Sequence, residues 1–433
     1  MPGIRENKGP FFGPSLAESL IINLRNFAQY SKTEIEWRLL LNTSFFYGTF
    51  PWTVVRIHRF FRPPSPAEIR SLMAIDYKNP KLIIETRKIE PGSISWRSPS
   101  NLAIIKYWGK HGNQLPRNPS ISFTLDKAYT ETTLEYAPKT GVDQGIELEF
   151  LFDGQPNEAF GGKVRKFLES ITDIFPFLRQ LKLSIRSANS FPHSSGIASS
   201  ASSMSALALC LCTLEDELFN DLDDDVAFRQ KASFVARLGS GSACRSIYPG
   251  LAVWGEMGEI HGSSDLYAIP YKDEVHETFL TYQDAILIVS KGEKSVSSRA
   301  GHALMDNNPY AESRYQQARQ RLHGLLMAMR TGDVDVFGQI LEAEALTLHA
   351  LMMASNYILV KPNTLTLIDK VQAFRKETGH PLYFSLDAGP NLHLLYPGRI
   401  KQVVENFIDD QLVQYCENGQ WIADEAGEGP LQL

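Results

Sequence analysis

The sequence predicts an α+β fold, and three observations support that prediction. Short runs rich in β-branched and aromatic residues alternate with stretches whose apolar residues recur at helical spacing. Breaks containing glycine or proline separate these segments, and a chain of 433 residues is long enough for two domains or more. A polar, glycine-containing stretch around residues 256–280 precedes a fresh strand, which places a domain boundary near residue 276.

From Met73 onward the expected elements follow one another along the chain. We expect strands over 81–89, 93–99, 131–137 and 145–152, a helix over 162–175 and a strand over 181–189. A serine-rich helix beginning near Ile197 comes next. Beyond the boundary we expect a strand over 284–290, two long helices over 310–329 and 334–353, and a strand pair formed by 382–389 and 391–397.

The first 72 residues differ from the rest. Residues 15–30 are typical of an amphipathic helix, and residues 45–66 are aromatic and basic and end in a proline-rich break. The uncharged run from Leu39 to Val55 is shorter than the roughly 20 apolar residues that a bilayer span needs. Three interpretations stay open: a membrane-surface or targeting segment, an accessory extension, and an upstream stretch read from a wrong start, with Met73 as the natural beginning.

Charge and cysteine content exclude several classes of protein. The formal net charge is -6 and the basic residues are scattered, which argues against general nucleic-acid binding. Four cysteines are too few for a disulfide scaffold, and their spacing matches no zinc site. No signal-peptide pattern is present, so we expect a reducing, cytoplasmic location.

The stretch from Phe191 to Leu211, "FPHSSGIASSASSMSALALCL", combines small polar residues with an apolar helix face. A helix that begins there presents unpaired backbone N–H groups with no bulky side chain in front of them, which favours an anion. The hydroxyls of Ser199 and Ser200 could bind a phosphate or ligate its magnesium. The alternative is a close contact between helices, made by small residues.

Lysines and a tyrosine crowd the end of an apolar run in "SPSNLAIIKYWGKHG", residues 98–112. Lys106, Tyr107 and Lys110 could hold a polyanion by charge-assisted hydrogen bonds. The alternative is an edge strand that carries solvated lysines.

"GSGSACRSIYPG", residues 239–250, is a glycine–serine loop with one arginine. Ser240 and Ser242 offer hydroxyls, the glycines allow close backbone approach, and Arg245 can bind a carboxylate or a phosphate with two parallel hydrogen bonds. The alternative is a flexible surface turn.

"SLDAGPN", residues 385–391, places Asp387 at the end of a strand. A carboxylate held near a phosphate-rich site could serve as a general base. The alternative is an aspartate that forms a turn by bonding its own backbone. Because these four stretches are spread over two domains, we expect a cleft between the domains.

Together these stretches resemble the GHMP kinase superfamily and, within it, the diphosphomevalonate decarboxylase family. "NLAIIKYWGK", "NPSISFTL", "GIASSAS", "GSGSACRSIYPG", "SSRAGH" and "SLDAGPN" are similar to that family's signatures, in its order. "DAGPN" stands where kinases of the superfamily carry a glycine-rich third motif. One departure is "PHSSG", where the family more commonly has Pro-Thr-Ala-Ala-Gly. The resemblance covers the chain from about Met73 almost to its end.

The resemblance implies an enzyme that uses ATP and Mg2+ to convert diphosphomevalonate to isopentenyl diphosphate, CO2, ADP and phosphate. Asp387 would activate the tertiary alcohol, Lys106 would keep that carboxylate ionised, and Ser240 with Arg245 would bind the substrate carboxylate. The implied diphosphate ligands are Tyr107, Lys110, Ser242, Ser298 and Arg299. The implied ATP-binding residues are Ser194, Ser195, Gly196, Ala198, Ser199 and Ser200, with Ser200 near the magnesium.

The implied architecture has three parts: an N-terminal extension over 1–72, a ribosomal-protein-S5-like ATP-binding domain over 73–275, and a ferredoxin-like domain over 276–433. The expected partner is the small-molecule substrate, with no nucleic acid and no membrane, and a homodimer is one option for the assembly. Two alternatives stay open. One is a decarboxylase or kinase for mevalonate or its monophosphate, and the other is a catalytically silent ligand sensor on the same scaffold.

Overall fold

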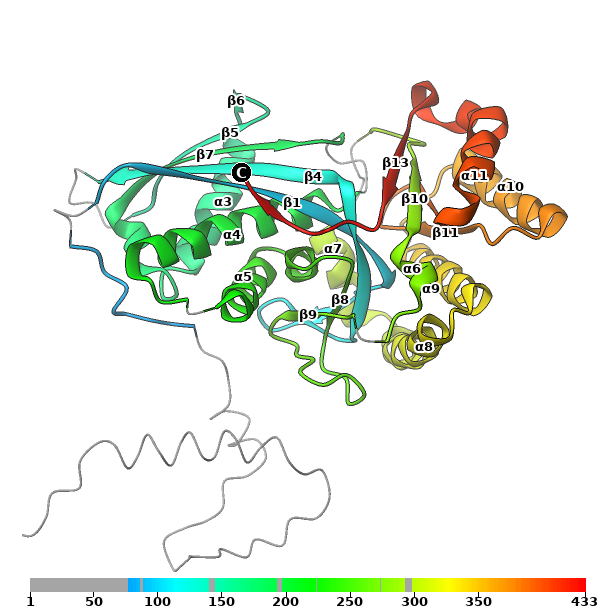
Figure 1. The fold of residues 1–433 in the computed structure, drawn as a ribbon, viewed down its shortest axis with the longest axis horizontal. Coiled ribbons are helices and arrows are strands. Elements are labelled where there is room, and N and C mark those ends of the chain that lie inside the picture. Colours follow the sequence, from blue (N-terminus) through cyan, green and yellow to red (C-terminus); the bar gives the residue numbers. More distant parts are fainter. Residues whose placement is uncertain are drawn as a thin grey trace, which may run out of the picture. The chain divides into compact units, whose positions relative to one another are not determined.

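The computed structural model describes residues 77–433, with gaps at 86–88, 140–144, 193–196, 223, 273 and 293–297. Contacts divide the chain into a unit of residues 1–74 and a unit of residues 75–433. Every described residue belongs to the second unit, so the expectations for residues 1–72 lie outside the described residues. Helices and strands are mixed along the described chain, which confirms the α+β prediction (Figure 1).

The larger sheet has eight strands. Its main path runs β14-β1-β4-β7-β5-β6, with β8 paired to β4 and β9 to β8, and only β5 and β7 are parallel. Burial along β7 alternates residue by residue, as expected for a strand with one face in the core. The strands are β1 (Gly92–Ile105), β4 (Ser120–Pro138), β5 (Glu147–Phe152), β6 (Gln155–Pro156), β7 (Leu181–Asn189), β8 (Leu251–Trp254), β9 (Ala268–Pro270) and β14 (Leu431–Gln432).

Three helices pack beside this sheet: α3 (Glu158–Ser170), α4 (Ser199–Phe219) and α5 (Asp225–Gly239). Figure 1 shows α4 along β1 and β4, and residues 205–215 of this helix are all buried. The α5 helix is capped by Asp224, whose carboxylate accepts the Ala227 N–H. These helices and the sheet enclose one hydrophobic core.

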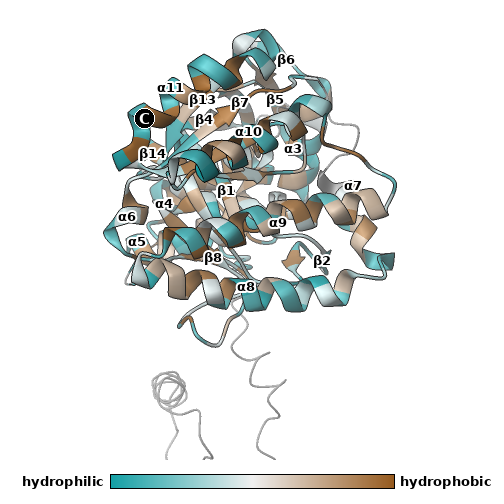
Figure 2. Cartoon of the chain, turned by 90° about the vertical axis from the view of Figure 1, so that its right-hand side faces the viewer, coloured by the Kyte–Doolittle hydropathy of each residue, from teal (hydrophilic) through white to brown (hydrophobic). Residues whose placement is uncertain are grey.

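The smaller sheet is antiparallel, in the order β11-β12-β10-β13. Its strands are β10 (Tyr282–Leu287), β11 (Tyr383–Leu386), β12 (Leu392–Pro397) and β13 (Trp421–Glu425). The accompanying helices are α6 (Glu277–Leu280), α7 (Ser298–Ala303), α8 (Ala311–Thr331), α9 (Val334–Ala354), α10 (Pro362–Thr378) and α11 (Lys401–Phe407). Figure 2 shows α8 and α9 side by side, with hydrophilic and hydrophobic residues mixed along both helices.

The two sheets are tied together near the C-terminus. After β13 the chain returns to the larger sheet, where β14 pairs with β1 at Trp96 and Arg97. The buried carboxylate of Asp424 on β13 accepts three main-chain N–H bonds from residues 126–128 of β4, each 2.8 Å long. The Asp424 carboxylate therefore supplies the hydrogen-bond acceptors for three consecutive main-chain N–H groups of β4.

A buried histidine–carboxylate pair lies on the smaller sheet. His393 on β12 is directly opposite Ser385 on β11, and its Nδ1 is 2.8 Å from Oδ2 of Asp284 on β10. Burial alone would lower the pKa of His393, but the Asp284 carboxylate outweighs it and raises that pKa above its usual value. The folded protein thus binds the His393 proton more tightly than the unfolded chain does.

Most expected elements are present, with shifted bounds, but the strand over 81–89 is not. Of its described residues none is in a strand, because the backbone N–H and C=O of Ile84 both bond the side-chain amide of Gln180. The serine-rich helix begins at Ser199 rather than near Ile197. The helices α5, α10 and α11 and the 3₁₀ helix over Gly241–Ile247 were not predicted.

No helix among the described residues is both long and apolar enough to cross a membrane. The thiols of Cys210, Cys212, Cys244 and Cys416 are all free and buried.

Replacing Asp424 by asparagine should lower the free energy of unfolding by about 1–3 kcal/mol, because the amide NH₂ group would face backbone N–H donors and leave at least one of them without an acceptor. Denaturant unfolding of Asp424→Asn against wild type measures the loss. Asp410→Asn, which changes an exposed carboxylate, is the control and should be neutral. An Asp424→Asn protein as stable as wild type would show that the hydrogen bonds between Asp424 and β4 do not stabilise the fold.

The His393–Asp284 pair should make stability fall as the pH rises. Its contribution is fully present below the unfolded histidine pKa of about 6.5 and is lost as the pH rises through the higher folded value. Between those values the free energy of unfolding should fall by at most about 1.4 kcal/mol per pH unit. Urea unfolding at several pH values should show this slope in wild type and in the exposed control His323→Gln. It should be absent in His393→Gln.

Candidate active site

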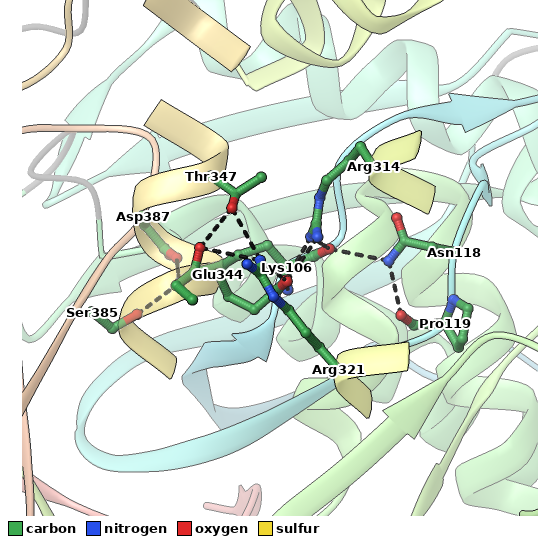
Figure 3. A network of polar contacts seen from close by, with 10 residues as sticks. Lys106, Asn118, Pro119, Arg314, Arg321, Glu344, Thr347, Ser385 and Asp387 are labelled. Atoms are coloured by element: carbon green, nitrogen blue, oxygen red, sulfur yellow. Dashed lines mark hydrogen bonds and ion pairs between the residues drawn. The ribbon is translucent and has the colours of Figure 1, made fainter. Parts of the chain in front are cut away.

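Lys106 follows the last residue of β1 and is 2% exposed. Its ammonium group donates to Oγ of Ser385 at 3.0 Å and to Oδ1 of Asp387 at 2.9 Å (Figure 3). Because Lys106 is buried, the alternative of an edge strand that carries solvated lysines is wrong for this residue. The structure therefore places two predicted site residues, 281 positions apart in sequence, in direct contact.

Asp387 stands just after β11, and its side chain is 23% exposed. Its carbonyl accepts the Gly389 N–H at 2.7 Å, so the residue does take part in a tight turn. The carboxylate, however, is bonded to Lys106. The turn uses the main chain of Asp387 and leaves its carboxylate at the ion pair.

The main chain of Lys106 is held on both sides. Its N–H donates to Oε2 of Glu344 on α9 at 2.9 Å, and its carbonyl accepts from Asn118 and from Arg314 on α8 at 3.1 and 3.2 Å (Figure 3). Glu344 has no exposed surface and also pairs with Arg314 and Arg321. Burial would raise the pKa of Glu344, but Arg314 outweighs it, and the pKa lies below its usual value.

Arg245 lies in the 3₁₀ helix over Gly241–Ile247 and is 1% exposed, so this loop is not a flexible surface turn. Its guanidinium donates to Oγ of Ser122 at 2.9 Å, to Oγ of Ser120 at 2.7 Å and to Oδ1 of Asn101 at 3.2 Å. All three acceptors are neutral side chains. Burial lowers the pKa of this arginine from its usual value, and Cys244 and the Asp387 carboxylate oppose that shift, so Arg245 lies within electrostatic range of Asp387 without a direct hydrogen bond to it.

Gly241 and Ser242, two residues of the predicted glycine–serine loop, make different contacts inside the protein. Gly241 lets the main chain pass close to Tyr107 and Trp254, because a Cβ there would lie 2.9 Å from atoms of both rings. The carbonyl of Ser242 accepts a bond from Asn101, which also binds Arg245. The close backbone approach that the sequence predicted is thus made to aromatic rings inside the protein.

Tyr107 is buried between the rings of Trp254 and His302, with centroids 4.6 and 4.3 Å away. Its hydroxyl is buried and has no hydrogen-bond partner among the described residues, and burial raises its pKa. Lys110 is partly buried on the short strand β2 (Lys110–His111), which pairs with β3 (Leu115–Pro116), and its ammonium donates to Gln114. An unpaired buried hydroxyl is uncommon and indicates a missing polar partner.

His302 on α7 contacts the segment that contains Tyr107 and Lys110. Its Nδ1 accepts the Gly109 N–H at 3.0 Å, and burial lowers its pKa to about 3, so the ring is neutral. Ser298 and Arg299 are the first two residues of α7, but their side chains lie outside the described part of the chain. The predicted diphosphate ligands Tyr107 and Lys110 therefore stand on a segment that α7 contacts directly.

The serine-rich stretch serves two purposes. Ser202 and Ser205 bond Thr130 and Ser98 of the larger sheet, as the packing alternative expected of small residues. Ser200 is exposed in the first turn of α4, and Oγ of Ser240 lies 3.4 Å from its hydroxyl. Ser194, Ser195 and Gly196 lie outside the described residues.

The start of α4 has a small residue at its N-cap. Ala198 precedes the helix in the left-handed region, with φ +46°, and its methyl group cannot cap the first turn. Its carbonyl accepts the Ala201 N–H at 2.7 Å, and backbone N–H groups at a helix N-terminus are the kind of donors that bind an anion. Ser199 stands partly exposed at the first helical position.

No group of three or more His, Cys, Asp or Glu side chains that could hold a metal ion occurs among the described residues. Magnesium usually keeps several waters and takes only one or two protein ligands beside phosphate oxygens, so it needs no such group. A polar cavity of about 310 Å³ beside Asn118 and Arg319 is lined by none of the predicted site residues.

Sequence reasoning missed residues that support the predicted ones. Ser120 and Ser122 alternate on β4 within the quoted motif "NPSISFTL", and that period-2 spacing could have shown that they share a face. Asn101 lies in another quoted motif. Glu344 and His349 carry no such signal, because their partners are far away in sequence.

Comparison with known proteins gives consistent results. A family model for the diphosphomevalonate decarboxylase-like N-terminal domain matches residues 98–268. The diphosphomevalonate decarboxylase of Candida albicans is 31% identical over 317 residues, which cover 70% of this chain and 84% of that relative.

Solved structures agree with the sequence comparison. The mevalonate diphosphate decarboxylase of Staphylococcus aureus aligns with a TM-score of 0.67 and 30% identity over 79% of this chain and 98% of that chain. MDDEF in complex with MVAPP, AMPPCP and magnesium aligns with a TM-score of 0.67 and 28% identity over 79% and 99%. The motifs, the GHMP-kinase-like fold and these likenesses together show that the chain belongs to the diphosphomevalonate decarboxylase family.

Proposed function

We propose that this protein catalyses the ATP-dependent decarboxylation of diphosphomevalonate to isopentenyl diphosphate, with release of CO2, ADP and phosphate. One observation carries the proposal. A buried lysine holds the Asp387 carboxylate, while the buried Arg245 guanidinium has only neutral partners among the described residues. A site with one fixed carboxylate and one cation whose hydrogen-bond partners are all neutral suits a substrate that brings both a hydroxyl group and a carboxylate.

The ion pair supplies the base. In the expected reaction the tertiary alcohol is phosphorylated, departure of that phosphate leaves positive charge beside the carbon that bears the carboxylate, and CO2 is lost. Asp387 accepts the proton of the hydroxyl group or orients it, a role worth on the order of 10²–10⁴ in rate. The Lys106 ammonium keeps Asp387 ionised and fixes its direction.

Arg245 binds the substrate carboxylate, together with Ser240. A buried charge is stable only when it is paired and hydrogen-bonded, and the three neutral side chains around Arg245 supply hydrogen bonds without charge. An incoming carboxylate supplies the charge. Because Ser120, Ser122 and Asn101 hold the guanidinium plane, the arginine is oriented before substrate binds.

The substrate diphosphate is bound by Tyr107, Lys110, Ser242, Ser298 and Arg299. The buried hydroxyl group of Tyr107 supports this assignment, because it has no protein partner among the described residues. A diphosphate oxygen would accept its hydrogen bond. The assignment also favours diphosphomevalonate over mevalonate and its monophosphate, which lack the second phosphate group that this set would bind.

ATP is bound at the start of α4 by residues 194–196 and by Ala198, Ser199 and Ser200. The helix start behind the small residue Ala198 and the exposed residue Ser200 fit a phosphate chain and one magnesium ligand. The related MDDEF structure holds AMPPCP, an ATP analogue, and magnesium. Bound magnesium would neutralise charge on the ATP phosphates, and this chain would contribute the Ser200 hydroxyl group to it.

The assembly and location remain part of the proposal. We place the boundary between an ATP-binding domain and a C-terminal domain near residue 276, with the extension over 1–72 outside both. The protein acts in the cytoplasm on a small molecule. A homodimer is one option, which the oligomeric state in solution would decide.

The reaction is tested by measuring ADP and CO2 release in parallel on mevalonate, its monophosphate and its diphosphate. We expect equal amounts of both products from the diphosphate and little from the other two. ADP without CO2 would indicate a kinase. Binding of diphosphomevalonate with neither product would indicate the ligand sensor.

Arg245→Ala should weaken transition-state binding by about 2–5 kcal/mol, partly because the substrate carboxylate is left unpaired. Arg245→Lys keeps the charge but loses the planar fork, so it should also be impaired. ATP affinity should hardly change in either variant. The measurements are kcat/KM for diphosphomevalonate and the Kd of ATP, and equal losses in both would indicate a collapsed loop instead.

Asp387→Asn keeps the size of the side chain but removes the charge and the basic oxygen. Phosphorylation and CO2 release should both fall by roughly 10²–10⁴ in kcat, with a modest change in KM because other residues bind the carboxylate and diphosphate. Melting temperature, ADP release and CO2 release are measured on one preparation. A folded variant that still makes CO2 at near the wild-type rate would end the general-base assignment.

A further inference from the structure

The two members of the central ion pair come from different sheets. Lys106 follows β1 of the eight-stranded sheet, and Asp387 follows β11 of the four-stranded sheet. Their separation therefore depends on how the two sheets are held relative to each other. The α9 helix packs against both β1 and β11, so it is a common neighbour of the two strands.

One side chain of α9 holds the Lys106 main chain. Glu344 accepts the Lys106 N–H, and its carboxylate is fixed in turn by Arg314 and Arg321 (Figure 3). Arg314 also donates to the Lys106 carbonyl. The peptide groups on both sides of the Lys106 Cα are thus bonded to one buried ionic cluster.

A second side chain of α9 holds the Asp387 main chain. Nε2 of His349 lies 3.0 Å from the Asp387 carbonyl oxygen, and the side chain is 3% exposed. A carbonyl only accepts, so Nε2 carries the proton in this contact. Nδ1 is then an acceptor, and it is buried with no partner among the described residues. Burial lowers the pKa of His349 to about 4, so the ring is neutral.

We infer that α9 is a rigid spacer that sets the distance between Lys106 and Asp387, with Glu344 and His349 as its two positioning residues. They are five residues apart, about 7.5 Å along the helix axis. Neither residue is assigned contact with substrate. The inference rests on the proposed function, because it assumes that the Lys106–Asp387 geometry limits the rate.

The alternative is that both residues only stabilise the fold. Glu344 would then be an ordinary buried ion pair between α8 and α9, and His349 a core histidine. The two interpretations differ for His349, because a buried acceptor without a partner is unfavourable in the folded state. Removing the unpaired Nδ1 acceptor should therefore not lower the free energy of unfolding. Removing the Nε2 hydrogen bond to the Asp387 carbonyl should lower kcat if the position of Asp387 limits catalysis.

His349→Phe tests the inference most sharply, because it keeps a ring but removes both nitrogens. We expect a melting temperature equal to or above that of wild type, with kcat lower by at least 10-fold and at most about 10²-fold, since displacements near 1 Å can have effects of that size. KM for diphosphomevalonate should change little. His349→Gln, which can still donate to the Asp387 carbonyl, should recover part of kcat.

Glu344→Gln tests the other end of the spacer. It should lower kcat similarly with KM nearly unchanged. Glu215→Gln is the control, because Glu215 is a buried glutamate on α4 that pairs with Lys231 on α5. Its kcat per folded molecule should stay at the wild-type value. If Glu344→Gln does not fold, the two His349 variants alone decide.

The outcomes separate this inference from the proposed function. Wild-type kcat in folded His349→Phe, with Asp387→Asn inactive, would overturn the spacer and leave the function standing. Equal loss of kcat in the Glu215 and Glu344 variants would also overturn it. Full activity of Asp387→Asn would instead overturn the proposed role of Asp387.

Discussion

The structure depends on one contact, in which a buried ammonium group from one sheet meets a partly exposed carboxylate from the other. A lysine that is 2% exposed is stable only if its charge is paired, and Asp387 and Ser385 provide the partners. The ion pair thus joins the end of β1 to the end of β11 on the smaller sheet. Ion pairs of this kind are weak evidence for stability, so we interpret this one as a requirement of function.

Arg245, the second buried cation of the site, differs from Lys106 because its hydrogen-bond partners carry no charge. Arg245 is as deeply buried as Lys106, yet its acceptors are two serine hydroxyls and an amide oxygen. A protein carboxylate in their place would compete with the carboxylate of the substrate. In the function that we propose, one cation is paired inside the protein and holds the base, and the other is paired by the substrate carboxylate.

Local sequence patterns predicted most of the helices and strands, but they did not predict the hydrogen bonds between residues far apart in the sequence. The alternation on β7 and the helical spacing of α8 and α9 are short-range signals, and the elements are close to where they were expected. The strand over 81–89 was wrong because one glutamine side chain takes the hydrogen bonds of Ile84. No local sequence pattern shows that a distant side chain will take the backbone hydrogen bonds that a neighbouring strand would otherwise make.

The same distinction applies to the site. Lys106, Arg245 and Asp387 were found because they lie in recognisable motifs, and the structure brings Lys106 and Asp387 into contact. Glu344 was missed because its role is a bond to a backbone N–H 238 residues away. Buried serines of the α4 stretch were also ambiguous, since a hydroxyl that binds phosphate and one that bonds a neighbouring strand look alike in sequence.

The central claim is that the Lys106 charge is kept for catalysis. Lys106→Met, which keeps a long apolar side chain and removes the ammonium group, tests it directly when ADP release, CO2 release and the free energy of unfolding are measured together. The account predicts a folded protein in which both products form more slowly by about 10²–10³, the effect of removing a preorganised charge from a site. A folded Lys106→Met protein that releases CO2 at near the wild-type rate would contradict it.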